Sequence, residues 1–274
     1  MAASVLNKQY RFILVSDLDW TMVDHDDKEN TSLHAFNKLW QSEFAQDCLL
    51  VFSTGRSLKL YNELRDEVPL GVPDVLICSV GTEIFFEKPG SDGAEPQPDK
   101  KWTQLLDQGW NRKAALEAAA QLSELKPQSE SEQRPHKLSY IVSVKGDAAE
   151  KVVSQLEDKL QAAGVTAKVI YSGGADLDIL PQHASKGKGL EFLLGEVREL
   201  VGAPKDGVLV NGDSGNDIEL FAVPGVRGCM VVNAHPELKK WCDAHPSPNL
   251  FQASKRCAGG IVEALQHFKL AKHT

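Results

Sequence analysis

The sequence has few of the features that would settle its class at once. Only five of its 274 residues are cysteine, and no two of them form a Cys-x-x-Cys pair. An odd number of cysteines without such pairs argues against a disulfide framework and against a structural zinc site. We therefore interpret the cysteines as buried free thiols and expect a protein of the reducing cytoplasm.

Positive charge is in the minority as well. The chain has 30 Lys and Arg against 38 Asp and Glu, which gives a formal net charge of −8. This balance argues against non-specific binding to nucleic acid or to an anionic membrane. No apolar run approaches the ~18–20 residues of a membrane span. The first residues lead into a strand-like run without a separate hydrophobic region, so we expect no secretory signal.

Short apolar runs alternate with helical patterns towards both ends of the chain. Because these runs are apolar throughout, they are typical of strands in a parallel sheet that is covered on both faces. Helices are expected between them at 32–45 and 217–222. This alternation predicts a doubly wound, Rossmann-like α/β core. The predicted strands are 12–16, 49–53, 75–79, 208–211 and 230–233.

The middle of the chain interrupts that pattern with a strand–helix pattern of its own. A polar segment rich in proline and glycine at 88–101 precedes it, and a helix follows to about residue 125. A strand at 138–144, a helix at 148–163 and a strand at 167–171 come next. We predict an inserted α+β cap domain at 87–172, between core segments at 1–86 and 173–274.

Two acidic clusters each follow a predicted core strand. Asp17 and Asp19 end the first strand, where residues i and i+2 point the same way. Asp213 and Asp217 follow the strand at 208–211 and are four residues apart at a helix start. Open α/β sheets bind ligands at the carboxyl ends of their strands. Neighbouring carboxylates stay ionised together when a positive charge joins them, and Mg²⁺ prefers oxygen ligands of this kind.

Two further segments complete a pattern suited to phosphate. Thr54 and Gly55 follow the second strand and offer a hydroxyl and close backbone approach at a helix start. Lys186 also stands at a helix start, where its ammonium can balance phosphate charge. Any one of these segments alone could be a solvated turn or a helix cap. Four of them, each after a strand or at a helix start, favour a phosphate site.

Rival motifs do not match. An EF-hand loop starting at Asp17 needs Gly and Glu at its sixth and twelfth positions, where the chain has Met22 and Lys28. The Gly-Asp-Ser-Gly string at 212–215 is similar to that of a serine protease, but it stands between an α/β strand and a helix. No Walker A or Gly-x-Gly-x-x-Gly motif follows a strand.

The four segments resemble the motifs of the haloacid dehalogenase-like hydrolases. Longer strings resemble the sucrose-phosphate phosphatase family and are spread from residue 16 to residue 270: SDLDWTMVDHDD, LLVFSTGRS, PDVLICSVGTEI, SEQRPHKLSYIVS, DLDILPQHASKGKGL, NGDSGNDIELF, VVNAHPEL and HFKL. Trp20 departs from the His or Asn that family members often carry. The chain stops at Thr274, so we expect the short form without the additional C-terminal domain of land-plant relatives.

The resemblance implies a role for each motif residue. Asp17 would be the nucleophile that forms an aspartyl-phosphate, and Asp19 the general acid and later the general base. Thr54 and Lys186 would complete the catalytic set. Mg²⁺ would be held by Asp17, the main-chain carbonyl of Asp19, Asp213 and Asp217. Implied substrate contacts are Gly55, Arg56 and Asn216 at the phosphoryl group and Glu132, Gln133, Lys137 and Asp178 at the sugar.

The implied function is the Mg²⁺-dependent hydrolysis of sucrose 6-phosphate to sucrose and phosphate, the last step of sucrose synthesis. The expected partner is a small sugar phosphate, and sucrose-phosphate synthase is a further candidate. We expect the protein to be a monomer. Two alternatives stay open: a phosphatase of the same mechanism for another sugar phosphate, and a non-catalytic protein that binds sucrose phosphate or the synthase. The catalytic motifs do not separate the two phosphatases, whereas the presence of Asp17, Asp19 and Lys186 disfavours the idle protein.

Overall fold

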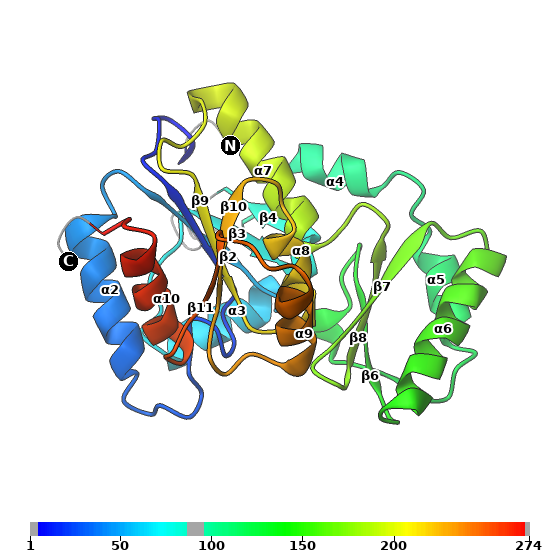
Figure 1. The fold of residues 1–274 in the computed structure, drawn as a ribbon. Helices are drawn as coiled ribbons and strands as arrows, with labels where there is room; N and C mark the ends of the chain where they lie inside the picture. The colour runs from blue at the N-terminus through cyan, green and yellow to red at the C-terminus, as the bar shows by residue number, and fades with distance from the viewer. Residues whose placement is uncertain (1–4, 87–95, 272–274) are drawn as a thin grey trace.

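The computed structural model describes residues 5–86 and 96–271 and contains two sheets (Figure 1). The larger sheet has seven strands in the order β11-β10-β9-β1-β2-β3-β4, and all neighbours are parallel except β3 and β4. The predicted α/β core with a mostly parallel sheet is confirmed. Its strands are β1 (Ile13–Ser16), β2 (Leu49–Ser53), β3 (Val75–Cys78), β4 (Glu83–Phe85), β9 (Val208–Gly212), β10 (Val226–Met230) and β11 (Leu250–Gln252).

Helices cover both faces of this sheet (Figure 1). Because successive side chains of a strand point to opposite faces, Ile13 and Val15 pack in one core cluster while Phe12 and Leu14 pack in the other. Burial on both faces explains why these strands are apolar without alternation. One cluster includes α2 (Thr31–Glu43), α3 (Leu58–Glu67) and α10 (Cys257–His267), and the other α4 (Lys100–Leu106), α7 (Lys186–Val201), α8 (Ile218–Phe221) and α9 (Pro236–Ala244).

The strand predicted at 230–233 is wrong in its position. The structure places β10 at Val226–Met230, so the apolar residues Val231 and Val232 follow the strand. Arg227 and Gly228 hid this strand from the hydrophobic pattern. A Cβ on Gly228 would lie 2.5 Å from the ring of Phe221, so close packing requires glycine there. The short strands β4 and β11 were not predicted either.

The smaller sheet is antiparallel, with the order β5-β6-β8-β7. Its apolar face packs against α5 and α6, on the far side from the core (Figure 1). Leu138 and Tyr140 of β6 lie in this apolar cluster, so Ser139 between them points to the opposite face. The elements are α5 (Arg112–Ala119), β5 (Leu125–Pro127), β6 (Leu138–Val142), α6 (Asp147–Ala162), β7 (Ala167–Ser172) and β8 (Asp176–Pro181).

The limits of the inserted domain differ from those drawn on the sequence. Strand β8 belongs to the smaller sheet, although it lies beyond the predicted end at residue 172. Trp102 and Leu106 of α4 pack in the core cluster, although they lie beyond the predicted start at residue 87. That start itself falls outside the described residues. We propose a cap domain that spans residues 107–181.

Helix α7 offers a matched test of the core packing. Leu193 is 0% exposed and Leu200 is 43% exposed. We expect Leu193→Ala to lower the free energy of unfolding by about 2–5 kcal/mol through lost burial and a residual cavity. Leu200→Ala should change it by less than about 0.5 kcal/mol. Urea denaturation of both variants measures this, and equal losses would contradict the assigned packing.

Candidate active site

Three adjacent strands of the large sheet position the site. Strands β9, β1 and β2 are neighbours, and Ser16 at the end of β1 lies in register with Asn211 and Phe52. Asp17 and Asp213 therefore leave the sheet side by side at its carboxyl edge. The backbone N–H of Asp17 donates to the Asn211 carbonyl (3.1 Å), which ties the two chain exits together.

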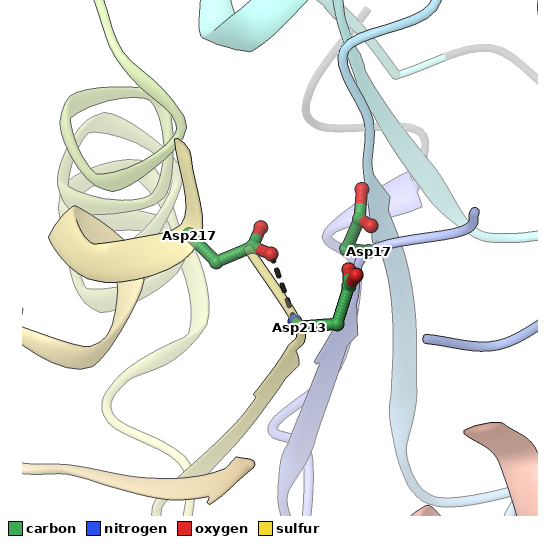
Figure 2. A group of neighbouring side chains, drawn as sticks. All are labelled: Asp17, Asp213 and Asp217. Atoms are coloured by element: carbon green, nitrogen blue, oxygen red, sulfur yellow. Dashed lines mark hydrogen bonds between the residues drawn. The ribbon is translucent and has the colours of Figure 1, made fainter. Parts of the chain in front are cut away.

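A buried cluster of three carboxylates forms at this edge. Asp17, Asp213 and Asp217 each offer a carboxylate oxygen, and these oxygens lie within 4.8 Å of one another (Figure 2). The ammonium of Lys186 donates to Asp17 Oδ1 (2.6 Å) and to Asp217 Oδ1 (2.7 Å). Lys186 is 1% exposed and comes from the first turn of α7. The structure thus brings together residues that are up to 200 positions apart in the sequence.

Further hydrogen bonds orient the carboxylates. The Thr21 hydroxyl donates to Asp213 Oδ1 (2.9 Å). Oδ2 of Asp217 accepts the backbone N–H groups of Asp213 (3.0 Å) and Ser214 (3.1 Å), the first of which is drawn in Figure 2. A Cβ on Gly212 would lie 2.6 Å from the Asp217 side chain, so glycine is needed for this approach.

Burial and mutual repulsion perturb the cluster strongly. Burial raises the pKa of Asp17 well above its usual range; Lys186 opposes this shift, and Asp217 adds to it. The pKa of Asp213 is also raised, first by burial and then by the charges of Asp17 and Asp217. Burial alone would lower the pKa of Lys186, but the two carboxylates raise it. Three ionised carboxylates would carry more negative charge than one ammonium balances, which is why protons are held more tightly here.

This donor set suits a hard divalent cation. It consists of carboxylate oxygens, and its excess negative charge is what such an ion would neutralise. Haloacid dehalogenase-type phosphatases generally use Mg²⁺. Asp19 is predicted to bind the metal through its main-chain carbonyl, and its side chain is engaged by basic residues.

The Asp19 carboxylate is held by two basic side chains. Arg56 donates from Nε to Oδ2 and from Nη2 to Oδ1, both at 2.7 Å, and His25 Nε2 lies 2.7 Å from Oδ1. Burial alone would raise the pKa of Asp19, but these hydrogen bonds and charges outweigh it and hold the pKa far below its usual range. Asp19 is thus a carboxylate in this conformation.

The segment after β2 lies beside the acidic cluster. Thr54 is fully buried, and its Oγ1 accepts the N–H of Arg56 (3.1 Å). Gly55 lines the cavity, and the Asn216 side-chain nitrogen lies 3.8 Å from where a Gly55 Cβ would be. Gly55 and Asn216 therefore share one side of the cavity.

A cavity of about 620 Å³ lies between the acidic cluster and the cap. Three of the four residues predicted to contact the sugar line it, namely Glu132, Lys137 and Asp178. Lys137 also donates to Glu132 Oε2 (2.5 Å) and to the Gly55 carbonyl (3.0 Å). Gln133 is not among the lining residues, because its side chain bonds to the backbone of Ser139 and Gln128.

Several lining residues were not predicted as site residues. His25 contacts Asp19 and lines the cavity. Gln128, Ser139 and Asp176 line the cap side. The alternation of polar Asp176 and Asp178 with apolar Leu177 and Ile179 is the signal that could have revealed β8 and its polar face.

The family model of the sucrose-6F-phosphate phosphohydrolases matches residues 10–269. This chain belongs to that family. Sucrose-phosphatase 1 of Nicotiana tabacum is 47% identical over 271 residues, which cover 98% of this chain and 62% of that protein. The chain therefore spans less than two thirds of the length of this curated relative. The predicted family resemblance is confirmed.

Two further relatives match over nearly their whole length. The sucrose-phosphatase of Synechocystis sp. PCC6803, solved in complex with sucrose and phosphate, is 35% identical with a TM-score of 0.82 and covers 95% of this chain and 98% of its own. Mannosylfructose-phosphate phosphatase of Agrobacterium fabrum is 32% identical and covers 94% of this chain and 97% of its own. A solved haloacid dehalogenase subclass IIB sugar phosphatase, 15% identical with a TM-score of 0.59, shares this fold. The predicted haloacid dehalogenase-type fold is therefore confirmed.

Other expectations from composition can be compared with the described residues. All five cysteines are buried and free, as predicted. In the ranges 5–86 and 96–271, no helix combines the length and the apolar character needed to cross a bilayer.

The raised carboxyl pKa values predict a pH-dependent, metal-dependent stability. Asp17 and Asp213 bind protons more tightly in the folded chain than in the unfolded chain. Their contribution to the free energy of unfolding is therefore complete below the pKa of the unfolded chain and is lost as the pH rises through the pKa of the folded chain. We expect the melting temperature of metal-free protein to fall between about pH 5 and about pH 9. Mg²⁺ at about 100 times its Kd should raise the free energy of unfolding by about 2.7 kcal/mol.

Calorimetry with and without Mg²⁺ tests this prediction. Asp213→Asn should remove most of the Mg²⁺ effect, whereas Asp243→Asn, a change of an exposed aspartate, should keep it. A wild-type melting temperature that does not respond to Mg²⁺ at any pH would contradict the assignment of the cluster.

Proposed function

We propose that this protein is a Mg²⁺-dependent phosphatase that hydrolyses sucrose 6-phosphate to sucrose and phosphate. The observation that carries the proposal is the position of Asp17. This residue lines a cavity that also has polar cap residues in its wall, and Lys186 donates a hydrogen bond to its carboxylate. The family membership of the whole chain supports the same conclusion. The reaction would complete sucrose synthesis.

In this proposal Asp17 attacks phosphorus and the ester oxygen of the sugar leaves, so that an aspartyl-phosphate forms. Lys186 donates to Asp17 at 2.6 Å and favours its ionised form against the effect of burial. Asp17, Asp213 and Asp217 would hold Mg²⁺, with the Asp19 carbonyl as a further ligand. The bound ion would neutralise charge on the phosphoryl oxygens, which is the main requirement of phosphoryl transfer.

Asp19 is proposed as the general acid that protonates the leaving sugar oxygen and then as the general base for the attacking water. Its ion pair with Arg56 opposes protonation. A phosphate ester in the cavity would offer Arg56 a competing anion with the same bidentate geometry. We therefore propose that Arg56 moves from Asp19 to the substrate, which frees Asp19 to take up a proton.

The phosphoryl oxygens would be held by Thr54, the Gly55 N–H and Asn216. Gly55 and Asn216 line the same cavity as Asp17. The sugar would contact the polar face of the cap sheet, where Ser139 and Asp178 are opposite each other in register. Glu132, Gln133 and Lys137 remain proposed sugar-binding residues. Of these, Glu132 and Lys137 line the cavity.

One alternative substrate class has support from a relative. The similarity to a mannosylfructose-phosphate phosphatase favours other phosphorylated disaccharides as the second candidate. We also propose a cytoplasmic monomer, with sucrose-phosphate synthase as a candidate partner.

A phosphate-release panel tests the function directly. Sucrose 6-phosphate should be hydrolysed faster than fructose 6-phosphate, glucose 6-phosphate and trehalose 6-phosphate, and only with Mg²⁺ present. Asp17→Asn keeps the shape of the side chain but removes the nucleophile. It should lower kcat by about 10³-fold or more while circular dichroism stays unchanged. Substantial turnover by this variant would reject Asp17 as nucleophile.

Cap recognition is tested by Asp178→Ala. Removing this carboxylate takes away hydrogen-bonding capacity on the cap side of the cavity, so KM for sucrose 6-phosphate should rise by about tenfold. The small ester p-nitrophenyl phosphate should keep its KM. Asp158→Ala, at an exposed position of α6 in the same domain, is the matched control. An unchanged KM for the sugar phosphate would remove Asp178 from the site.

A further inference from the structure

A bidentate ion pair joins the cap to the core outside the cavity. Arg134 of the cap donates from Nη2 to Glu83 Oε1 (2.7 Å) and from Nε to both carboxylate oxygens (3.1 Å). Glu83 begins β4 of the core and is 4% exposed. Neither residue is among those lining the cavity. The pair therefore has no direct access to a substrate there.

Glu83 continues the contact into the core through Ser79. The Ser79 hydroxyl donates to Glu83 Oε2 at 2.7 Å, and Ser79 is fully buried. Ser79 and Val80 both have left-handed backbone, with φ of 54° and 58°. Such φ values are unusual for non-glycine residues, most of all for a β-branched one, and persist only where surrounding contacts hold them.

This strained turn holds the segment proposed to bind phosphate. The N–H of Ser79 donates to the Arg56 carbonyl (2.8 Å), and the N–H of Val80 donates to the Thr54 carbonyl (3.1 Å). The next residue, Gly81, packs against the start of α7, since a Cβ there would lie 2.1 Å from the Ser185 carbonyl oxygen. One turn thus supports both Thr54–Arg56 and the helix that begins with Lys186.

We propose that Glu83 is a positioning residue, which makes the geometry of the phosphate-binding segment Thr54–Arg56 depend on the docking of the cap through Arg134. An undocked cap leaves Glu83 without its guanidinium partner and Ser79 with a weaker constraint. The strained turn then relaxes, and the phosphate-binding segment loses its support. The inference rests on the proposed function, because it assigns a regulated geometry to the same site.

The same cap segment contacts the phosphate-binding segment at a second place. The N–H of Ser57 donates to Glu132 Oε1 (3.0 Å), and Lys137 donates to the Gly55 carbonyl. These two residues line the cavity, so their replacement would change sugar contacts as well. The Arg134–Glu83 pair allows cap docking to be tested without touching the cavity wall.

The test measures the Kd of inorganic phosphate by isothermal titration calorimetry in the presence of Mg²⁺. Phosphate is too small to need the cap as a binding surface, so a role limited to sugar recognition predicts no change. The double variant Glu83→Gln with Arg134→Met removes both charges and leaves no unpaired charge buried. We expect its Kd to rise by about tenfold, which is about 1.4 kcal/mol.

The phosphate Kd of three further variants is measured in the same way. Ser79→Ala removes the hydroxyl that donates to Glu83, so it should raise the Kd similarly while the cap stays docked. Val152→Ala destabilises the cap from within α6, where Val152 is 4% exposed, and should leave the Kd unchanged. Lys101→Met removes an ion pair with Glu196 on the core surface and should also leave it unchanged.

Several outcomes would overturn the proposal. A phosphate Kd equal to that of wild-type protein, in either Ser79→Ala or the double variant, would contradict it. A rise of the Kd in Val152→Ala as large as that in the double variant would contradict it as well. If the double variant does not fold, Ser79→Ala alone decides. Failure of the proposed function is recognised separately, because wild-type protein would then bind phosphate without hydrolysing sucrose 6-phosphate.

Discussion

The ammonium of Lys186 is the charge on which the site depends. Burying several carboxylates together is costly unless opposite charge compensates them, and Lys186 is the cation that contacts both Asp17 and Asp217. Its position is set by the packing of α7. Gly187 lies so close to α8 that a Cβ would be 2.3 Å from the Glu219 carbonyl oxygen. The packing of α7 therefore positions the ammonium that opposes the raised pKa of Asp17.

The cap supplies polar side chains to the cavity, whereas the core supplies the carboxylate cluster. Its sheet turns an apolar face to α5 and α6 and a polar face to the cavity, because strand side chains alternate. The core alone could bind a phosphoryl group but would offer few contacts to a sugar. The hydrogen bond that Lys137 donates to Gly55 and the one that Ser57 donates to Glu132 connect the two halves of the proposed site.

The core motifs could be predicted because each stands at a fixed place in a regular pattern. Asp17, Thr54 and Asp213 follow buried strands, and parallel neighbours bring their carboxyl ends to one edge. The cap contacts could not be predicted in the same way. Gln133 was predicted to contact the sugar, yet its side chain bonds to the backbone of Ser139 and does not line the cavity. His25 was not predicted as a site residue, yet it contacts Asp19.

The sequence by itself determined the α/β class, the order of the four motifs and the family. These follow from local periodicity and from residue types at short spacing, which do not require knowledge of distant contacts. Only the tertiary structure decided that Arg56 neutralises Asp19, that β8 belongs to the cap, and that Arg134 meets Glu83. These contacts join residues 37 or more positions apart or depend on strand order. Because packing selects such partners, no local pattern in the chain encodes them.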